Sequence, residues 1–142
     1  YKAMYNKKIY IYGNDFNTYD GTCIRDYIHI KDICLAMEKS IKYLFKNKKS
    51  NILNIGNYKG LSNNEIIKYV KKRIKNYLNL KYVDRRKGDV SKLICNSNRA
   101  KKILGWKANN SNIKNIIDDE IKWILKINKM GLKRKFKNYL NK

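Results

Sequence analysis

The sequence predicts an α/β fold, and three observations support this class. Short segments rich in isoleucine and tyrosine alternate with longer segments in which apolar residues recur at helical spacing. The 142 residues have the length of one ordinary domain, and a hydrophobic content of 43% is sufficient for a core. No repeat or low-complexity linker divides the chain. We therefore expect one α/β unit over residues 1–130, followed by a basic tail over residues 131–142.

The first half of the chain is expected to form two extended segments, a helix and a further strand. A short strand is expected at residues 9–12, and CIRDYIHI (23–30) alternates in the manner of a second extended segment. From Lys31 the period becomes helical, with one apolar face made of Ile33, Met37, Ile41 and Leu44. Asp32 lies in the first turn, where the helix dipole favours an acid. NILNIG (51–56) is expected to be the next strand.

The second half begins with a helix-start signal. Ser62 and Glu65 have the spacing of a capping box, and they open a helix whose buried stripe is expected to be Ile66, Val70, Ile74 and Tyr77. Short strands are expected at 80–83 and 93–95. Ser97 or Asn98 is expected to cap a short helix that ends near Gly105. Ser111 is expected to cap the last helix, with Ile113, Ile117, Ile121 and Ile124 facing inward.

The formal net charge of +23, from 34 Lys and Arg against 11 Asp and Glu, raises the question of a nucleic-acid partner. The excess is mostly Lys, and it accompanies abundant Asn, Ile and Tyr and no Pro, the joint bias that A+T-rich codons produce. We interpret the charge as this background and do not expect nucleic acid as the partner. The tail at 131–142 is the best remaining nucleic-acid candidate.

The cysteine usage and the hydropathy pattern exclude several classes. Cys23, Cys34 and Cys95 are odd in number and widely spaced, with a single His, so we expect no metal site and no disulfide framework. No run of about 18 apolar residues is present, so we expect no membrane span. The N-terminus lacks the apolar centre of a signal peptide and an initiating Met, and it reads as a chain entered midway. A reducing, cytoplasmic setting fits these features.

The most varied stretch, residues 13–30, points to a polar, anionic ligand. Arg25 lies there among apolar neighbours on a strand pattern, and Arg86 and Asp89 lie in a distant turn, DRRKGD. Two guanidinium groups from separate segments can bind phosphate oxygens in bidentate fashion, and a carboxylate suits a sugar or ribose hydroxyl. The alternative, that Arg25 pairs internally with Asp26 or Asp89, is equally open at this point.

Other motifs have structural interpretations. The turn GNYKG (56–60) has glycines four residues apart instead of the G-x-G-x-x-G spacing, so we expect no NAD site in this chain. Two Tyr-x-x-x-Lys matches, at residues 27–31 and 77–81, do not fall on a single helix pattern. His29 is interpreted as a core or capping residue, and the acidic run at 118–120 as a solvated helix face.

Six segments together resemble a known family, in the order in which that family has them. They are YIYGNDF (10–16), DGTCIRDYIH (20–29), LNIG (53–56), KGLS (59–62), RRKGD (85–89) and SNRAKKILGW (97–106). The chain resembles the UDP-glucose 4-epimerases of the extended short-chain dehydrogenase/reductase family. The pairing of DGTCIRDYIH with a later R-R-x-G-D favours these isomerases over the related dehydratases and decarboxylases.

The resemblance implies that the chain is the C-terminal, substrate-binding portion, without the N-terminal Rossmann half. In the family that half binds NAD and supplies the catalytic Tyr-x-x-x-Lys, so the resemblance implies that this chain alone is inactive. The site residues that it implies all bind the substrate: a uracil segment, two diphosphate arginines, a ribose carboxylate and a further substrate contact. These positions are, in that order, Tyr10, Ile11 and Tyr12; Arg25 and Arg86; Asp89; and Leu93.

The implied substrates are UDP-glucose and UDP-galactose, interconverted by hydride removal to NAD and return to the other face of the sugar's fourth carbon. A clamped nucleotide with a loosely held hexose suits that reaction. A homodimer is open for the full-length enzyme. Two alternatives stay open: another nucleotide-sugar epimerase or dehydratase of the family, and a small basic nucleic-acid-binding protein.

Overall fold

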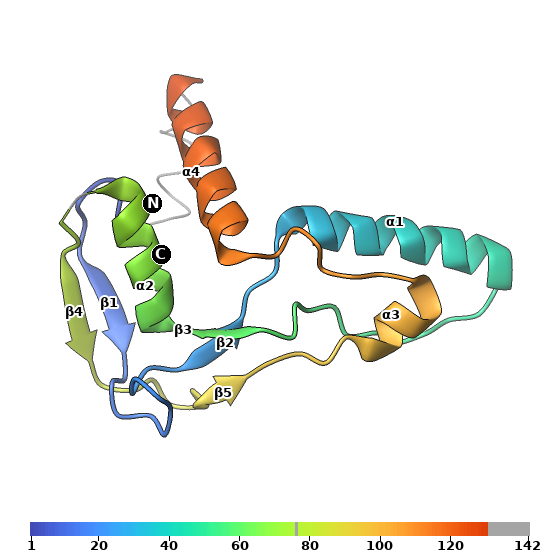
Figure 1. The fold of residues 1–142 in the computed structure, drawn as a ribbon, viewed down its shortest axis with the longest axis horizontal. Coiled ribbons are helices and arrows are strands. Elements are labelled where there is room, and N and C mark those ends of the chain that lie inside the picture. The colour runs from blue at the N-terminus through green and yellow to red at the C-terminus, as the bar shows by residue number, and fades with distance from the viewer. Residues whose placement is uncertain (76, 131–142) are drawn as a thin grey trace.

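The computed structural model describes residues 1–75 and 77–130, and within them it confirms the α/β class (Figure 1). The expected basic tail at 131–142 lies outside the described residues. The strands are β1 (Ile9–Tyr12), β2 (Ile24–Asp26), β3 (Gly60–Ser62), β4 (Leu80–Val83) and β5 (Lys92–Leu93). The helices are α1 (Ile30–Asn47), α2 (Asn63–Ile74), α3 (Asn98–Leu104) and α4 (Ile113–Lys129).

The strands form two small sheets. In the first, β1 pairs in parallel with β4, so that Ile9 lies opposite Leu80 and Tyr12 opposite Val83. In the second, β2 lies between antiparallel β3 and parallel β5. Figure 1 shows α2 beside the β1–β4 pair at one end of the molecule and α1 with α3 at the other. The segment from β2 into α1 therefore links the two ends.

Trp106 is the centre of the buried core between α1 and α3. Its side chain is 1% exposed, it packs with Ala36 and Ala100, and its indole N–H donates to the Asp32 carbonyl at 2.8 Å. That bond satisfies the one polar atom of a large apolar ring. Half-buried residues pack around this cluster: Ile28, Leu35, Leu53, Ile55, Leu104 and Ala108.

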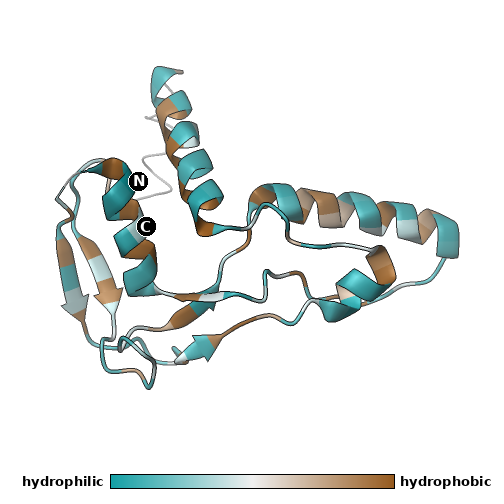
Figure 2. Cartoon of the chain, viewed as in Figure 1, coloured by the Kyte–Doolittle hydropathy of each residue, from teal (hydrophilic) through white to brown (hydrophobic). Residues whose placement is uncertain are grey.

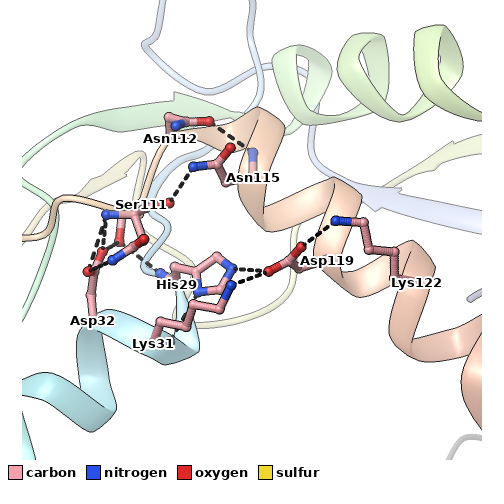
Figure 3. A network of polar contacts seen from close by, with 9 residues as sticks. His29, Lys31, Asp32, Ser111, Asn112, Asn115, Asp119 and Lys122 are labelled. Carbon is pink, nitrogen blue, oxygen red and sulfur yellow. Dashed lines mark hydrogen bonds and ion pairs between the residues drawn. The ribbon is translucent and has the colours of Figure 1, made fainter.

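His29 begins α1, as its interpretation as a capping residue requires. Its imidazole Nδ1 accepts from the Lys31 N–H at 3.0 Å, which satisfies one of the free donors of the first turn. Its Nε2 lies 3.3 Å from the Asp119 carboxylate of α4 (Figure 3). Asp119 also binds Lys31 and Lys122, and Asp118 pairs with Arg73. The acidic run at 118–120 is therefore not the simple solvated face that the sequence suggested.

The start of α2 confirms the capping box. The Ser62 hydroxyl accepts from the Glu65 N–H at 3.1 Å, and the Glu65 carboxylate accepts from the Ser62 N–H at 2.9 Å. These reciprocal bonds satisfy two N-terminal donors of the helix. Tyr77, expected on the buried stripe of this helix, lies beyond its end and is 79% exposed.

Two further expectations about elements are wrong. Asn112, not Ser111, caps α4, because its side chain accepts from the Asn115 N–H at 2.9 Å. Ser111 instead accepts from the His29 N–H at 2.9 Å and donates to the buried Asp32 carboxylate (Figure 3). Residues 51–56, expected to be a strand, belong to no strand of the described chain.

Candidate functional site

The site begins with β1, whose side chains alternate as a strand's must. Ile11 is 3% exposed and faces the core, whereas Tyr10 and Tyr12 are 43% and 37% exposed. Isoleucine and tyrosine both favour a half-buried pleated surface, which explains why this segment forms a strand. The side chain of Ile11 is buried, and its backbone faces β4, on the same side as the N–H groups of Ile9 and Gly13, so Ile11 turns no polar group toward a ligand.

The backbone of β1 is paired on one side only. The Ile9 N–H donates to the Asn79 carbonyl and the Gly13 N–H to the Val83 carbonyl, each at 2.8 Å. Since backbone groups alternate in direction along a strand, those of Tyr10 and Tyr12 point away from β4. No strand in the described part of the chain covers that edge. It offers donors and acceptors to a flat polar ring.

Arg25 extends from β2 to the loop that precedes β5. Its Nη1 donates to the carbonyls of Ile24 and Val90, both at 2.9 Å, and its Nη2 lies 3.7 Å from an oxygen of Asp89. The side chain is 24% exposed. Two carbonyl acceptors therefore fix the orientation of the guanidinium group and leave part of it open to solvent.

Arg86 reaches the same carboxylate from the other side of the turn. Its Nε and Nη2 donate to the two oxygens of Asp89 at 3.0 and 3.3 Å. Its guanidinium carbon lies 4.7 Å from the centre of the Tyr12 ring, within cation–π range. The hydrogen bond to Asp89 raises the pKa of Arg86, so the side chain stays charged. Asp89 and Arg86 together thus join β1, β2 and the turn into one cluster.

The structure distinguishes between the two internal carboxylate partners that the sequence suggested for Arg25. Of its two internal partners considered from the sequence, Asp89 is the one it contacts. The Asp26 carboxylate instead accepts three backbone N–H bonds, from Asn57 at 3.0 Å and from Tyr58 and Cys95 at 3.1 Å. With two guanidinium groups around one carboxylate, the cluster has a net charge of +1. Such a surplus attracts an anion.

Leu93 lies beside this cluster without a polar role. It is opposite Arg25 in the β2–β5 pairing, and it is 62% exposed. An isobutyl side chain can neither donate nor accept a hydrogen bond, so any contact of Leu93 with a ligand is apolar.

Arg85 has a part in the site that the sequence did not reveal. Its Nε donates to the Asp15 carboxylate at 2.7 Å, and its guanidinium carbon lies 4.3 Å from the centre of the Phe16 ring. The bond from Arg85 lowers the pKa of the Asp15 carboxyl. Arg85 therefore connects the loop after β1 to the turn after β4. Its neighbour Arg86 faces Asp89 instead. The sequence held part of this information, because the side chains of adjacent residues in an extended segment point in opposite directions, so Arg85 and Arg86 were bound to face different partners.

A cavity of about 560 Å³ lies next to the Arg85–Asp15 ion pair, at the carboxyl ends of β1 and β4. Arg25 and Arg86 do not line it. Its walls are Gly13, Asn14, Asp15, Tyr82, Val83, Asp84 and Arg85. Two acidic side chains, Asp15 and Asp84, make it a less favourable place for an anion than the Arg25–Arg86–Asp89 cluster.

The described residues do not fit NAD or a metal ion. In the 56–60 turn the N–H groups of Asn57 and Tyr58 already donate to Asp26, and a Cβ on Gly56 would lie 2.4 Å from that of Cys95. A pyrophosphate therefore has neither free donors nor space there. Neither Tyr-x-x-x-Lys match of the described chain lies on one helix. Over residues 1–75 and 77–130, no cluster of metal-binding side chains is present, and no helix is long and apolar enough to cross a membrane.

Comparison with known proteins gives concordant results. A family model described as GDP-mannose 4,6 dehydratase matches residues 2–119. The UDP-glucose 4-epimerase of Lacticaseibacillus casei is 42% identical over 113 residues, which are 80% of this chain and 34% of that protein. Among solved structures, UDP-glucose-4-epimerase from Stenotrophomonas maltophila, with bound NAD and formylated UDP-arabinopyranose, superposes with a TM-score of 0.81 at 29% identity. The match covers 87% of this chain and 36% of that one.

A second structure agrees with the first. UDP-glucose 4-epimerase from Bifidobacterium longum, in complex with NAD⁺ and UDP, superposes with a TM-score of 0.78 at 29% identity. It matches 88% of this chain and 37% of its own. The chain thus spans about a third of the length of the relatives that it matches.

Proposed function

The chain belongs to the family described as GDP-mannose 4,6 dehydratase, in which its relatives are UDP-sugar 4-epimerases, and we propose that it is the part that anchors UDP. The observation that carries the proposal is the convergence of Arg25 and Arg86 on the Asp89 carboxylate. The two arginines come from segments 61 residues apart (86 − 25), so only the fold brings them together.

The proposed diphosphate site uses the surplus charge of this cluster. Arg86 is 62% exposed, so it can turn a free N–H edge toward phosphate oxygens while its other edge stays on Asp89. Arg25 is held in place by two carbonyls and needs little reordering. Each charge-assisted contact contributes about 1.5–3 kcal/mol, enough for two of them to anchor a nucleotide.

The nucleoside is proposed to lie along β1. The free edge of Tyr10 and Tyr12 supplies the backbone donors and acceptors that pair with a uracil edge, with Ile11 between them in the core. Asp89 is proposed to accept the ribose hydroxyls in addition to the arginines. The hexose then extends past Leu93, whose apolar side chain cannot form a hydrogen bond with the sugar hydroxyls. Tight binding of the non-reacting UDP with a loosely held sugar suits epimerisation.

For the whole protein we extend the proposal to UDP-glucose 4-epimerase activity on UDP-glucose and UDP-galactose, in galactose metabolism. NAD, which supplies the hydride chemistry of such an enzyme, would be held outside this chain, because the described residues do not fit it. On its own the chain is therefore expected to be inactive. The three cysteines are free thiols, which suits a reducing cytoplasm.

Calorimetric titration with UDP tests the proposal. Wild-type chain should bind UDP, and Arg86→Ala should weaken binding by about 10- to 100-fold, the loss of one charge-assisted contact. Lys87→Ala is the matched control, since it removes the same charge from an exposed neighbour that makes no polar contact in the described structure. Equal losses in the two variants, or tight DNA binding with a steep salt dependence and no response to UDP, would favour a basic nucleic-acid-binding protein.

A further inference from the structure

Helices α2 and α4 lie side by side along an apolar groove. Figure 1 shows the two helices next to one another, and Figure 2 shows apolar bands along both of them. A cavity of about 260 Å³ lies in the groove. The residues of the two helices that give it its apolar walls, which we call the α2–α4 groove, include Ile66, Val70, Ile74, Ile117, Ile121 and Ile124.

The described residues leave this groove partly open. On α2, Ile66, Val70 and Ile74 recur at the spacing of a buried stripe, yet α2 has no buried residue. On α4, Ile124 is 6% exposed, whereas Ile117 and Ile121 are only half-buried. An apolar stripe at helical spacing is normally covered by another element. The α2–α4 groove is therefore a surface on which a further apolar segment can pack.

The sequence that follows α4 has a matching pattern. Residues 131–142, GLKRKFKNYLNK, come directly after Met130, the last residue that the structure describes. The large apolar residues of this sequence are Leu132, Phe136, Tyr139 and Leu140. Their spacing of i, i+4, i+7 and i+8 is that of one face of a helix, and the basic residues fall outside it. A helix with such a face is stable when an apolar surface covers it.

We propose that residues 131–142 fold back along α4 and place this apolar face in the α2–α4 groove. Gly131 suits the reversal, because glycine readily adopts the left-handed conformation that ends a helix. A helix made of these residues would be about 18 Å long, and the stretch of α4 from Ile117 to Met130 is about 20 Å long. The segment is therefore long enough to cover the groove from one end of α4 to the other.

The charges of the groove and of the segment are complementary. Glu120 lines the same cavity and is exposed. Its neighbours Asp118 and Asp119 both have ion pairs, whereas Glu120 has none among residues 1–75 and 77–130. In a helix, Lys133 and Lys135 would lie at the two borders of the apolar face, where an ammonium group can reach a carboxylate beside the groove. An ion pair at this border would set the register of the segment.

Other occupants of the groove fit less well. A second copy of the chain also has a net charge of +23, so two copies repel one another. The chain's own segment is tethered at Met130, which gives it a high effective concentration at the groove. Nucleic acid would bind the lysines of the segment but would leave its apolar face uncovered.

The inference goes beyond the family and beyond the proposed function. The family model matches residues 2–119, so residues 131–142 lie outside the part of the chain that it describes. No residue of the α2–α4 groove belongs to the Arg25–Arg86–Asp89 cluster. Loss of UDP binding would therefore leave this inference standing.

Carbodiimide cross-linking of the full 142-residue chain tests the inference, because this reagent joins a carboxylate to an amine in direct contact. Peptide mass spectrometry should find Glu120 joined to Lys133 or Lys135. Asp84 is the matched control, since it is an exposed acid at the end of β4 and should be joined to neither lysine. Links to Asp84 that are as frequent as links to Glu120 would overturn the inference.

A mixture of isotope-labelled and unlabelled chains identifies whose groove the segment occupies. The inference predicts links only within one chain. Links between a labelled and an unlabelled chain would assign the α2–α4 groove to a second copy and would overturn the inference.

Variants followed by hydrogen exchange locate the contact. The amides of residues 132–140 should exchange about tenfold faster in Phe136→Lys than in the wild-type chain, because a charged side chain cannot enter the groove. Arg134→Ala is the control within the segment, since it changes the side opposite the apolar face. On the groove, Ile121→Lys should have the same effect as Phe136→Lys. Leu125→Lys, at a 48% exposed leucine of α4 that does not line the cavity, should leave the exchange unchanged.

Near-ultraviolet circular dichroism of the buried Trp106 checks that each variant is folded. Equal exchange in the wild-type chain and in a folded Phe136→Lys chain would overturn the inference. Protection of residues 132–140 that appears only after a DNA duplex is added would also overturn it, and would assign the segment to nucleic acid.

Discussion

Asp89 is the residue on which the candidate site depends, because its carboxylate holds two arginines at once. Its side chain is 17% exposed, and it lies 3.0 Å from Arg86 Nε and 3.7 Å from Arg25 Nη2. A carboxylate in this position orients both guanidinium groups and still has lone pairs for hydroxyl donors. Holding the arginines and the proposed binding of ribose hydroxyls are therefore separable, and ligands with and without those hydroxyls can distinguish the two.

Ribose recognition by Asp89 predicts a preference among nucleotides. The wild-type chain should bind UDP about tenfold more tightly than 2′,3′-dideoxy-UDP, because the second ligand lacks the hydroxyls that pair with a carboxylate. In Asp89→Asn the preference should shrink, since the amide accepts more weakly. Calorimetry with both ligands on both proteins measures the change. An unchanged preference in Asp89→Asn would show that the ribose lies elsewhere.

Asp119 predicts a pH dependence of stability. Hydrogen bonds from Lys31 and Lys122 lower the pKa of Asp119 to about 2. Since the pKa of an unfolded aspartate is about 3.9, this residue stabilises the fold above about pH 4, and the contribution disappears as the pH falls toward 2. Asp119→Asn should therefore lower the free energy of unfolding at pH 7 and have a much smaller effect at pH 2, where about half of the Asp119 carboxyl groups are protonated.

Urea denaturation at the two pH values measures this difference. Asp84→Asn is the control, because the exposed Asp84 has no ion pair in the described part of the chain and should change nothing at either pH. A loss of stability in Asp119→Asn that is the same at pH 7 and pH 2 would mean that the ion pairs contribute nothing.

Among the elements, α2 depends most clearly on a single side chain. Ser62 is fully buried, caps the helix through its hydroxyl and donates to the Asp20 carboxylate. Ser62→Ala should lower the free energy of unfolding by about 1–2 kcal/mol, the cost of a lost N-cap. Ser40→Ala is the control, because that hydroxyl only bonds a carbonyl within α1 and its loss should cost less than about 0.5 kcal/mol. Thermal unfolding of both variants tests this, and equal effects would contradict it.

Elements set by local sequence could be predicted, and those that depend on distant contacts could not. The strands at 9–12 and 80–83 and the capping box at Ser62 come from alternation and spacing within a few residues. At 51–56 the alternation was interpreted correctly, but a strand also needs a neighbour, which local sequence does not contain. At Ser111 the error was one residue, because the buried Asp32 uses that hydroxyl and leaves the cap to Asn112.

For the molecule as a whole, the sequence predicted the members of the site better than their contacts. Residue types and the family resemblance selected Arg25, Arg86 and Asp89, and the fold brings these three together. Two other contacts could not be predicted from local sequence, because each joins segments about 70 residues apart. They are the cation–π contact of Arg86 with Tyr12 and the ion pair of Arg85 with Asp15. The roles of the site residues in UDP binding stay predictions.

A structure of the chain in complex with UDP would show whether the two arginines bind the pyrophosphate. We expect pyrophosphate oxygens within hydrogen-bond distance of both Arg25 and Arg86, ribose hydroxyls on Asp89, and the uracil edge against the backbone of Tyr10 and Tyr12. UDP in the cavity between Gly13 and Arg85, or on a lysine-rich helix surface, with both arginines still turned only toward Asp89, would refute the proposed site.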